Sequence, residues 1–318
     1  MTSPQESFAF IFNNLEPAFS EELEIIPQHI FRKARAEEVE KIKEIIVQIG
    51  PLFIPEKSLP YEVKWEKSVN GNSYLASILP EKDWRYYVIV FQGTNSEIQE
   101  LGYASSLIKN HLDFGLIFIN FTPPIGLGTY VSPDVQNTFN YYCDYLNPLN
   151  MKPSCITKEE LCSIEMYYNS IKALSHDGYL YKAIENLGTL KNIPRKSDLL
   201  ILGYFAIIES IITHEPRSKE TLDSINHQFT NKLTLLRKRF TRPLDYSQYF
   251  QEGKEATIWK KLYDYRSCLA HGDNPDFSKI FTILKDKLSV FSFIHETLKL
   301  TIIAALKEPD LISDLRNC

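Results

Sequence analysis

The first half of the chain mixes strand-like and helix-like spacings of hydrophobic residues. Apolar residues recur every three or four positions over residues 36–49, which predicts an amphipathic helix ended by Gly50 and Pro51. Strands are predicted over residues 61–65, 73–79, 86–91 and 114–121, a helix over 97–110, a tight turn at Asn70 and Gly71, and a loop with a short extended segment over 21–32. Residues 1–150 are therefore expected to form a small α/β domain built on a sheet.

The second half carries helical spacing almost throughout. The stretch 147–154 is rich in turn residues and predicts the domain boundary. Thr157 and Glu160 have the spacing of a capping box at the start of the first helix, and Ser197 is placed to cap the third. Helices are expected over residues 158–174, 179–190, 198–213, 219–236, 255–270 and 278–306. The last has a near-heptad apolar stripe formed by Ile280, Leu284, Leu288, Phe291, Ile294, Leu298 and Ile302.

This pattern predicts an α+β two-domain fold, in which an all-helical bundle spans residues 155–318. Gly272 and Pro275 follow the fifth helix and should end it, with the glycine in the left-handed conformation.

Composition narrows the possible classes of protein. A formal net charge of −5 excludes a polycation that coats nucleic acid unaided, so a nucleic-acid site must be a local basic patch. The N-terminal residues lack the pattern of a secretory signal, and the apolar run 199–212 is too short to span a bilayer. Five scattered cysteines without a zinc spacing fit reduced thiols, so we expect a cytoplasmic protein without a membrane segment, metal or cofactor.

The clearest candidate for chemistry is an Arg-x4-His pair, Arg266 and His271, at the end of the fifth helix. His271 falls in the last helical turn, where the helix dipole favours a cation. Residues five apart do not share a face of a regular helix. If the two act together, either the helix end is distorted or the complementary arginine and histidine come from a partner subunit. Alternatively, Arg266 is in a surface ion pair and His271 caps the helix.

Glu209 is the only charged residue in the apolar run 199–212. Burying a carboxylate alone is costly, which predicts a partner, and an arginine from another helix is the natural one. The alternative is that Glu209 faces solvent on a narrow polar stripe with Ser210.

A second group of candidates could contact phosphates, because it clusters positive charge in a short stretch. An equally good interpretation is a solvated helix end, where the dipole favours cations. The candidate RNA-binding residues are Lys232, Arg237, Lys238, Arg239 and Arg242.

Residues 261–267 and 270–272, with their Tyr-x-x-Arg-x4-His-Gly pattern, resemble the signature of HEPN domains, more narrowly the ApeA-like group. Residues 204–209 resemble that group's acidic helix, and residues 31–39 are similar to a strand-to-helix junction that often precedes the domain. The clear resemblance covers residues 157–306. One position departs from the pattern: Ser267 follows the arginine, where many catalytic members have Asn, Asp or His.

The resemblance implies a metal-independent endoribonuclease acting as a homodimer, usually a toxin or an abortive-infection effector against phage. It implies that the RNA 2′-hydroxyl attacks its own phosphodiester, that His271 moves the proton, and that Arg266 holds the phosphate while Glu209 orients Arg266. The first domain would then sense a trigger or bind a partner such as an antitoxin. The rival hypothesis is a non-catalytic HEPN-type module that dimerises and binds a ligand or protein. The joint presence of Glu209, Arg266 and His271 favours the enzyme.

Overall fold

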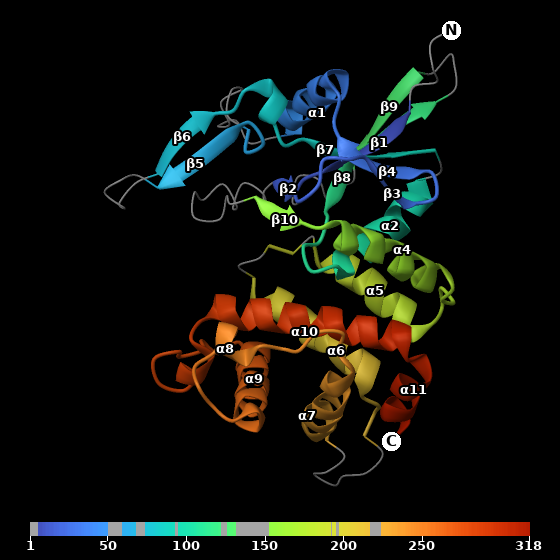
Figure 1. Cartoon of the computed structure of the whole chain (residues 1–318). Helices are drawn as coiled ribbons and strands as arrows, with labels where there is room; N and C mark the ends of the chain where they lie inside the picture. Colours follow the sequence, from blue (N-terminus) through green and yellow to red (C-terminus); the bar gives the residue numbers. More distant parts are fainter. Residues whose placement is uncertain are drawn as a thin grey trace. The chain divides into compact units, whose positions relative to one another are not determined.

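The computed structural model describes residues 6–49, 59–67, 74–92, 95–121, 126–131, 153–191, 193–194, 197–216 and 224–318. It divides into two compact units, Met1–Asn169 and Ser170–Cys318 (Figure 1). The first unit contains a sheet and the second is mostly helical, so the predicted α+β layout is confirmed. The first unit continues past the predicted boundary, of which residues 147–152 lie outside the described part.

The main sheet of the first unit is antiparallel at every strand pair. In the described residues its order is β3-β4-β7-β1-β8-β9. These strands are β1 (Ser7–Ile11), β3 (Leu23–Ile26), β4 (His29–Lys33), β7 (Tyr87–Phe91), β8 (Phe114–Phe121) and β9 (Gly126–Val131). Two smaller ribbons pair β2 (Leu15–Pro17) in parallel with β10 (Ser154–Ile156), and β5 (Val63–Lys67) with β6 (Tyr74–Ile78).

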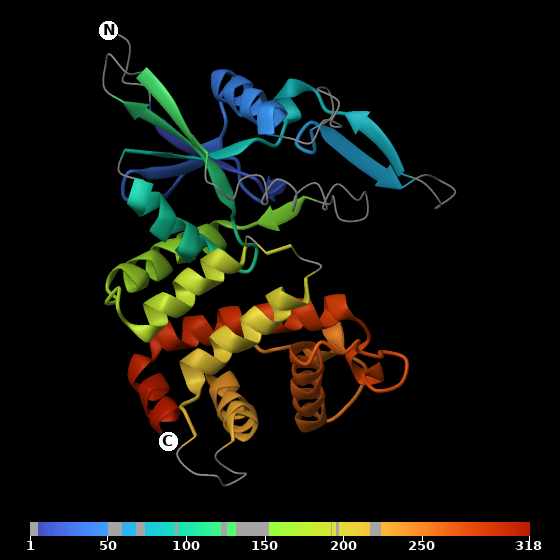
Figure 2. The same ribbon diagram turned by 180° about the vertical axis from the view of Figure 1, so that it is seen from behind.

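Helices cover the two faces of this sheet, α1 (Ala36–Ile49) on one and α2 (Asn95–Leu107) on the other (Figures 1 and 2). Side chains alternate between the faces of a strand, so Phe8 and Phe10 of β1 share one face. They join a buried cluster with Val39, Ile42 and Ile46 of α1. Burying both faces explains why the neighbouring strands β7, β1 and β8 are apolar almost throughout.

The sequence predicted about half of these elements and missed β1, β2, β9 and β10. The helix over 36–49 and the strand over 114–121 are confirmed at the predicted bounds, and β6, β7 and α2 lie within three residues of theirs. The segment 21–32 forms an antiparallel hairpin of β3 and β4 where a loop with one extended segment was expected. β1 was not predicted, because a strand buried on both faces has no alternation to show. The predicted stops at Gly50 and Pro51 and the turn at Asn70 and Gly71 lie outside the described residues.

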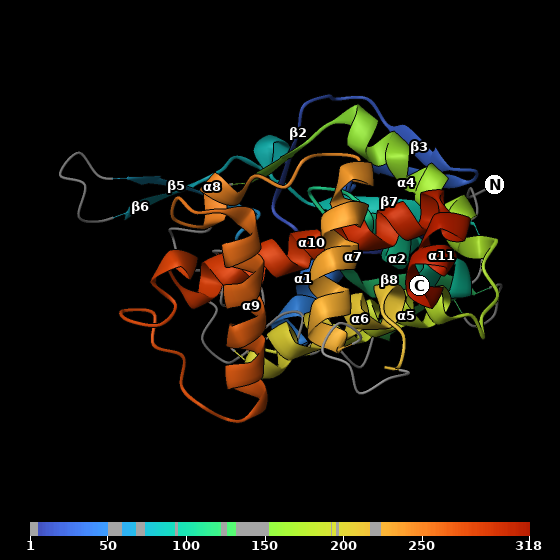
Figure 3. The ribbon, with the colours of Figure 1, turned by 90° about the horizontal axis from the view of Figure 1, so that it is seen from below.

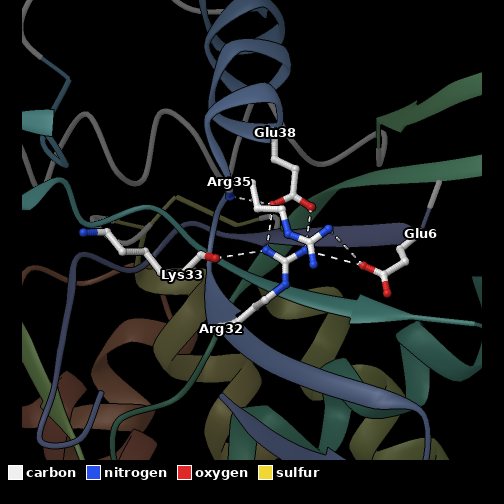
Figure 4. A network of polar contacts seen from close by, with 5 residues as sticks. All are labelled: Glu6, Arg32, Lys33, Arg35 and Glu38. Carbon is white, nitrogen blue, oxygen red and sulfur yellow. Dashed lines mark hydrogen bonds and ion pairs between the residues drawn. The ribbon is translucent and has the colours of Figure 1, made fainter. Parts of the chain in front are cut away.

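A buried ion pair joins β4 to the start of α1 (Figure 4). Arg32, 4% exposed, donates two hydrogen bonds to the two carboxylate oxygens of Glu38, at 2.8 and 2.7 Å. Glu38 also accepts from the backbone N–H of Arg35 at 2.8 Å, which satisfies a donor at the helix start. Burial lowers the pKa of Arg32, but the bonds to Glu38 and its charge outweigh this and leave the pKa raised. Arg32 therefore stays ionised.

The second unit is an assembly of helices whose hydrophobic faces meet at one central helix, α6. The helices are α4 (Lys158–Lys172), α5 (Tyr179–Leu190), α6 (Asp198–Ile212), α7 (Ile225–Leu236), α8 (Tyr246–Tyr249), α9 (Glu255–Ala270), α10 (Lys287–Lys307) and α11 (Pro309–Asn317), with α4 crossing the division between the units. Gly203 of α6 lies so close to Leu190 of α5 that an added Cβ would stand 2.7 Å from the leucine, so the glycine permits this close approach. α10 packs along α6, while α7 and α9 lie side by side against α6 (Figure 3).

Capping residues set several of the helix starts. The predicted capping box is confirmed: Glu160 accepts from the backbone N–H of Thr157 at 3.1 Å, and Thr157 accepts from that of Glu160 at 3.2 Å. Ser197 caps α6 as predicted. The predicted start of the fourth helix lies outside the described residues, and α7 begins after Ser224, whose side chain caps it.

The sixth predicted helix was too long at its N-terminal end. α10 begins at Lys287, where Asp286 is the cap, and not near Ser278. Lys285 has φ +58°, which no helix residue adopts, so the preceding segment cannot join the helix. The predicted stripe fails at Ile280 and Leu288, which are exposed, but holds at Phe291, Ile294, Leu298 and Ile302, which are buried. Among the described residues, α10 alone has the length and hydropathy of a membrane span, but 72% of that window is buried, as in the core helix of a folded domain.

Candidate functional site

Glu209 lies near the end of α6, a helix whose other residues are mainly apolar and buried. Its side chain is 14% exposed and accepts a hydrogen bond from Nη2 of Arg266 on α9 at 3.3 Å. The two residues are 57 positions apart in the chain, so the helix packing brings them together. The predicted ion pair is confirmed. The alternative, in which Glu209 shares an open polar stripe with Ser210, is wrong, because only Ser210 is exposed.

The contact between Glu209 and Arg266 uses only part of each group. Oε1 of Glu209 and Nε of Arg266 are buried without a hydrogen-bond partner in the described part of the chain. A carboxylate and a guanidinium can form two parallel bonds, and this pair forms one. The side chain of Arg266 is 31% exposed. Its guanidinium therefore retains bonding capacity for a further anion.

Tyr263 completes the cluster; it is the tyrosine of the Tyr-x-x-Arg-x4-His-Gly pattern, to which sequence reasoning assigned no role. It precedes Arg266 by three residues, a spacing that places the two side chains together on a helix. The guanidinium carbon of Arg266 lies 5.6 Å from the centre of the Tyr263 ring, within cation–π range. The other neighbour of the ring is Phe229 of α7, with a centroid separation of 5.7 Å. The i, i+3 spacing of an aromatic residue and an arginine was the available signal.

The environment shifts the pKa values of both acidic groups in the cluster upward. Burial raises the pKa of the Glu209 carboxyl above its ordinary value of 4.5, although the charge of Arg266 and a hydrogen bond from Tyr263 oppose the rise. Burial, followed by the negative charge of Glu209, raises the pKa of the Tyr263 hydroxyl to about 12. At neutral pH the tyrosine is therefore a neutral hydroxyl that can donate to the carboxylate.

His271 stands apart from this cluster. It is the exposed C-terminal cap of α9, and Gly272 follows with φ +79°, the left-handed conformation that was predicted. The backbone N–H groups of Gly272 and Asp273 close the helix end on the carbonyls of Leu269 and Cys268. Among the described residues, the imidazole forms no hydrogen bond or ion pair. The structure thus unites Glu209 with Arg266 but places His271 separately, freely accessible to solvent.

Lys232 does not belong to an exposed basic patch, and its prediction as a phosphate contact is wrong. Its side chain is only 7% exposed. Nζ donates to Oε1 of Gln228 at 3.2 Å and to the backbone carbonyl of Arg316 at 3.4 Å. These bonds hold the end of α11 against α7.

Two more of the predicted RNA-binding residues form ion pairs with carboxylates of the same chain. Arg237 forms an ion pair with Glu255, and Arg242 binds Oε1 of Glu296 at 2.5 Å. Both arginines are about one-third exposed. Of the predicted group, Arg239 and Lys238 are the exposed members, and Arg239 is 3.8 Å from Glu308. The stretch is therefore mostly neutralised within the fold.

Two further findings concern the whole chain. Within the described residues, no group of three or more His, Cys, Asp or Glu side chains lies close enough together to hold a metal ion. Comparison with protein-family models, with curated proteins and with solved structures finds no match.

Replacing Glu209 with glutamine should preserve or slightly increase the stability of the helical unit at pH 7. A folded pKa above 4.5 means that ionisation of Glu209 opposes folding, so the stability it contributes is complete below pH 4.5 and declines as the pH rises through the raised pKa. The glutamine side chain does not titrate. We expect the melting temperature of wild type, relative to Glu209→Gln, to fall between pH 4 and pH 7. Glu252→Gln, at an exposed position, is the control. A melting temperature of wild type that rises relative to that of Glu209→Gln between pH 4 and pH 7 would contradict the prediction.

Proposed function

We propose that this chain is a metal-independent endoribonuclease of the HEPN type, of the ApeA-like group that its C-terminal half resembles. The observation that carries the proposal is the contact between Glu209 and Arg266. The carboxylate of Glu209 on α6 holds Arg266 through one oxygen only. Arg266 lies on α9, the helix that ends at the exposed His271. An arginine held in this way suits an anion with several acceptor oxygens, such as a phosphodiester.

In the proposed reaction the RNA 2′-oxygen forms a bond to its own phosphorus while the bond from phosphorus to the 5′-oxygen breaks. His271 takes the proton of the 2′-hydroxyl or supplies a proton to the leaving 5′-oxygen. Arg266 stabilises the additional negative charge on the phosphate oxygens in the transition state. The products are a 2′,3′-cyclic phosphate and a 5′-hydroxyl. These steps need both an acid and a base, and a single imidazole can serve only one of them at a time.

We propose that a second copy of the chain supplies the other histidine. Within one chain no hydrogen bond or ion pair is found between the described His271 and Arg266, although both side chains are at least partly exposed. Two copies related by a two-fold axis would bring two Arg-x4-His motifs to one composite site. In this proposal the protein is a toxin or an anti-phage effector, and the first unit binds its trigger or an antitoxin.

The test is cleavage of total RNA and tRNA by the purified full-length protein in the presence of EDTA. We expect wild type to cleave and to leave cyclic-phosphate ends, while His271→Ala and Arg266→Ala lose about 10²-fold or more of the rate. His227→Ala, at an exposed position on α7, is a matched histidine control and should retain activity. Equal cleavage by all four proteins would show that the motif is not the site.

The second candidate is a non-catalytic HEPN-type module that dimerises and binds a ligand or a protein. Its support is that the bond between Glu209 and Arg266 also links α6 to α9, a role independent of catalysis. Ser267 is shorter than the residue many catalytic members carry there. Dimerisation without RNA cleavage by any of the proteins, in the presence of the isolated trigger, would favour this module.

A further inference from the structure

The hydrogen bond between Glu209 and Arg266 does not by itself fix the guanidinium. At 3.3 Å it is long for a charge-assisted bond, and it engages only Nη2. Arginine loses considerable rotamer entropy when it is held in one orientation. Since Nε has no partner among the described residues, the plane of the guanidinium must be set by a group that contacts its face.

Tyr263 is placed to be that group. Its ring lies 5.6 Å from the guanidinium carbon, and its hydroxyl interacts electrostatically with the Glu209 carboxylate that holds Arg266. Phe229 packs 5.7 Å from Tyr263 and also contacts Phe205 of α6 and Trp259 of α9. The ring of Tyr263 is thus held by the aromatic contacts between three helices. The ring is therefore a fixed surface against which the guanidinium of Arg266 can be oriented.

We infer that Tyr263 is a positioning residue, which orients Arg266 to receive an RNA phosphate through a ring under the guanidinium and a hydroxyl on Glu209. This inference rests on the proposed ribonuclease function. The two parts of the side chain have different tasks. The ring restricts Arg266 directly, while the hydroxyl keeps the Glu209 carboxylate in its bonding orientation.

Two substitutions separate the tasks. Tyr263→Phe keeps the ring and should lower kcat by a few-fold, while Tyr263→Leu removes the ring and should lower kcat by about 30-fold. Tyr265→Phe is the matched control, because the Tyr265 hydroxyl is buried on the same helix and has no partner in the described residues. Its activity should equal that of wild type.

The pH profile of cleavage distinguishes positioning from a structural role. The hydrogen bond from Tyr263 lowers the pKa of Glu209, so Tyr263→Phe should let that pKa rise further. The acid limb of the profile should then move to higher pH in Tyr263→Phe and remain in place in Tyr265→Phe. An unchanged acid limb, or equal kcat in the leucine and phenylalanine variants, would overturn the inference.

A double-mutant cycle tests the contact without relying on catalysis. The melting temperatures of Tyr263→Leu, Arg266→Gln and the double variant are measured for the full chain. If Tyr263 orients Arg266, the double variant should lose less than the sum of the single losses, by about 2 °C. Additive losses would overturn the inference whether or not RNA is cleaved. If wild type cleaves no RNA, the proposed function and the role of Tyr263 toward a phosphate are overturned. Non-additive losses of melting temperature would still support the conclusion that Tyr263 orients Arg266.

Discussion

Replacing Arg266 with lysine should lower kcat/KM for the proposed RNA cleavage by about 10³-fold, although the positive charge is kept. The guanidinium is a planar set of donors that can bond to Glu209 and to a phosphate together, whereas an ammonium is a point charge. Lysine also cannot match the stacking of a flat cation on the Tyr263 ring, which lies 5.6 Å away in wild type. The loss should appear at saturating substrate as well, since in the proposed reaction the arginine stabilises the transition state.

The measurement is the single-turnover rate on a short RNA, with Arg35→Lys as the control. Arg35 is an exposed arginine, 3.5 Å from Glu6 in the first unit, so its replacement changes the same chemistry away from the site. A loss below tenfold in Arg266→Lys would mean that charge alone suffices, and that the geometry of the guanidinium has no part in the reaction. Retained melting temperature in both variants would show that the loss does not come from unfolding.

Replacing Glu38 with glutamine should destabilise the first unit by about 3 kcal/mol, because it leaves a buried arginine without its counter-ion. Glu38 accepts both bonds from Arg32 and one from the backbone of Arg35. Glu6, at 3.7 Å, is too distant to replace them.

Unfolding of this unit can be followed by hydrogen exchange of amides in β4 and β7, which pair with each other. Glu37→Gln is the control, since Glu37 directly precedes Glu38 and its side chain is exposed. A loss below 1 kcal/mol in Glu38→Gln would show that solvent or Glu6 compensates for the missing charge.

The sequence predicted helices well where side chains mark their ends. The starts of α4 and α6 lie where predicted, because backbone N–H groups there are bonded by the side chains of Thr157, Glu160 and Ser197. The end of α9 also lies where predicted, because Gly272 adopts the left-handed conformation that ends the helix. The start of α10 was misplaced because hydrophobic spacing continues through Leu284, which is buried but lies in a separate 3₁₀ turn, Thr282–Leu284, before α10. Periodicity reports which residues are buried, and only the backbone conformation of Lys285 separates the two segments.

The candidate site was predictable in part for the same reason. A lone carboxylate in an apolar helix requires a partner, so the bond from Glu209 to Arg266 followed from the cost of burial. The burial of Lys232 could not be predicted from the sequence. Its Nζ bonds to Gln228 and to the backbone carbonyl of Arg316, and no local sequence pattern relates Lys232 to the distant Arg316. The role of Tyr263 depends on Phe229, a contact between helices that the spacing on one helix does not reveal.

The course of α4 determines where the chain can be cut. Residues up to Asn169 belong to the first unit, so the division falls inside this helix and not at the turn-rich stretch before it. β10 pairs with β2, and the Asn110 side chain donates to Cys155 and Glu160 at 2.8 and 3.1 Å. A fragment starting near Ser154 would therefore carry a strand and most of a helix without their partners, exposing Ile156 and Leu161 to aggregation. Screening for a well-behaved helical fragment should vary the first residue across 170–179, and poor solubility of longer fragments would say nothing about the proposed ribonuclease activity.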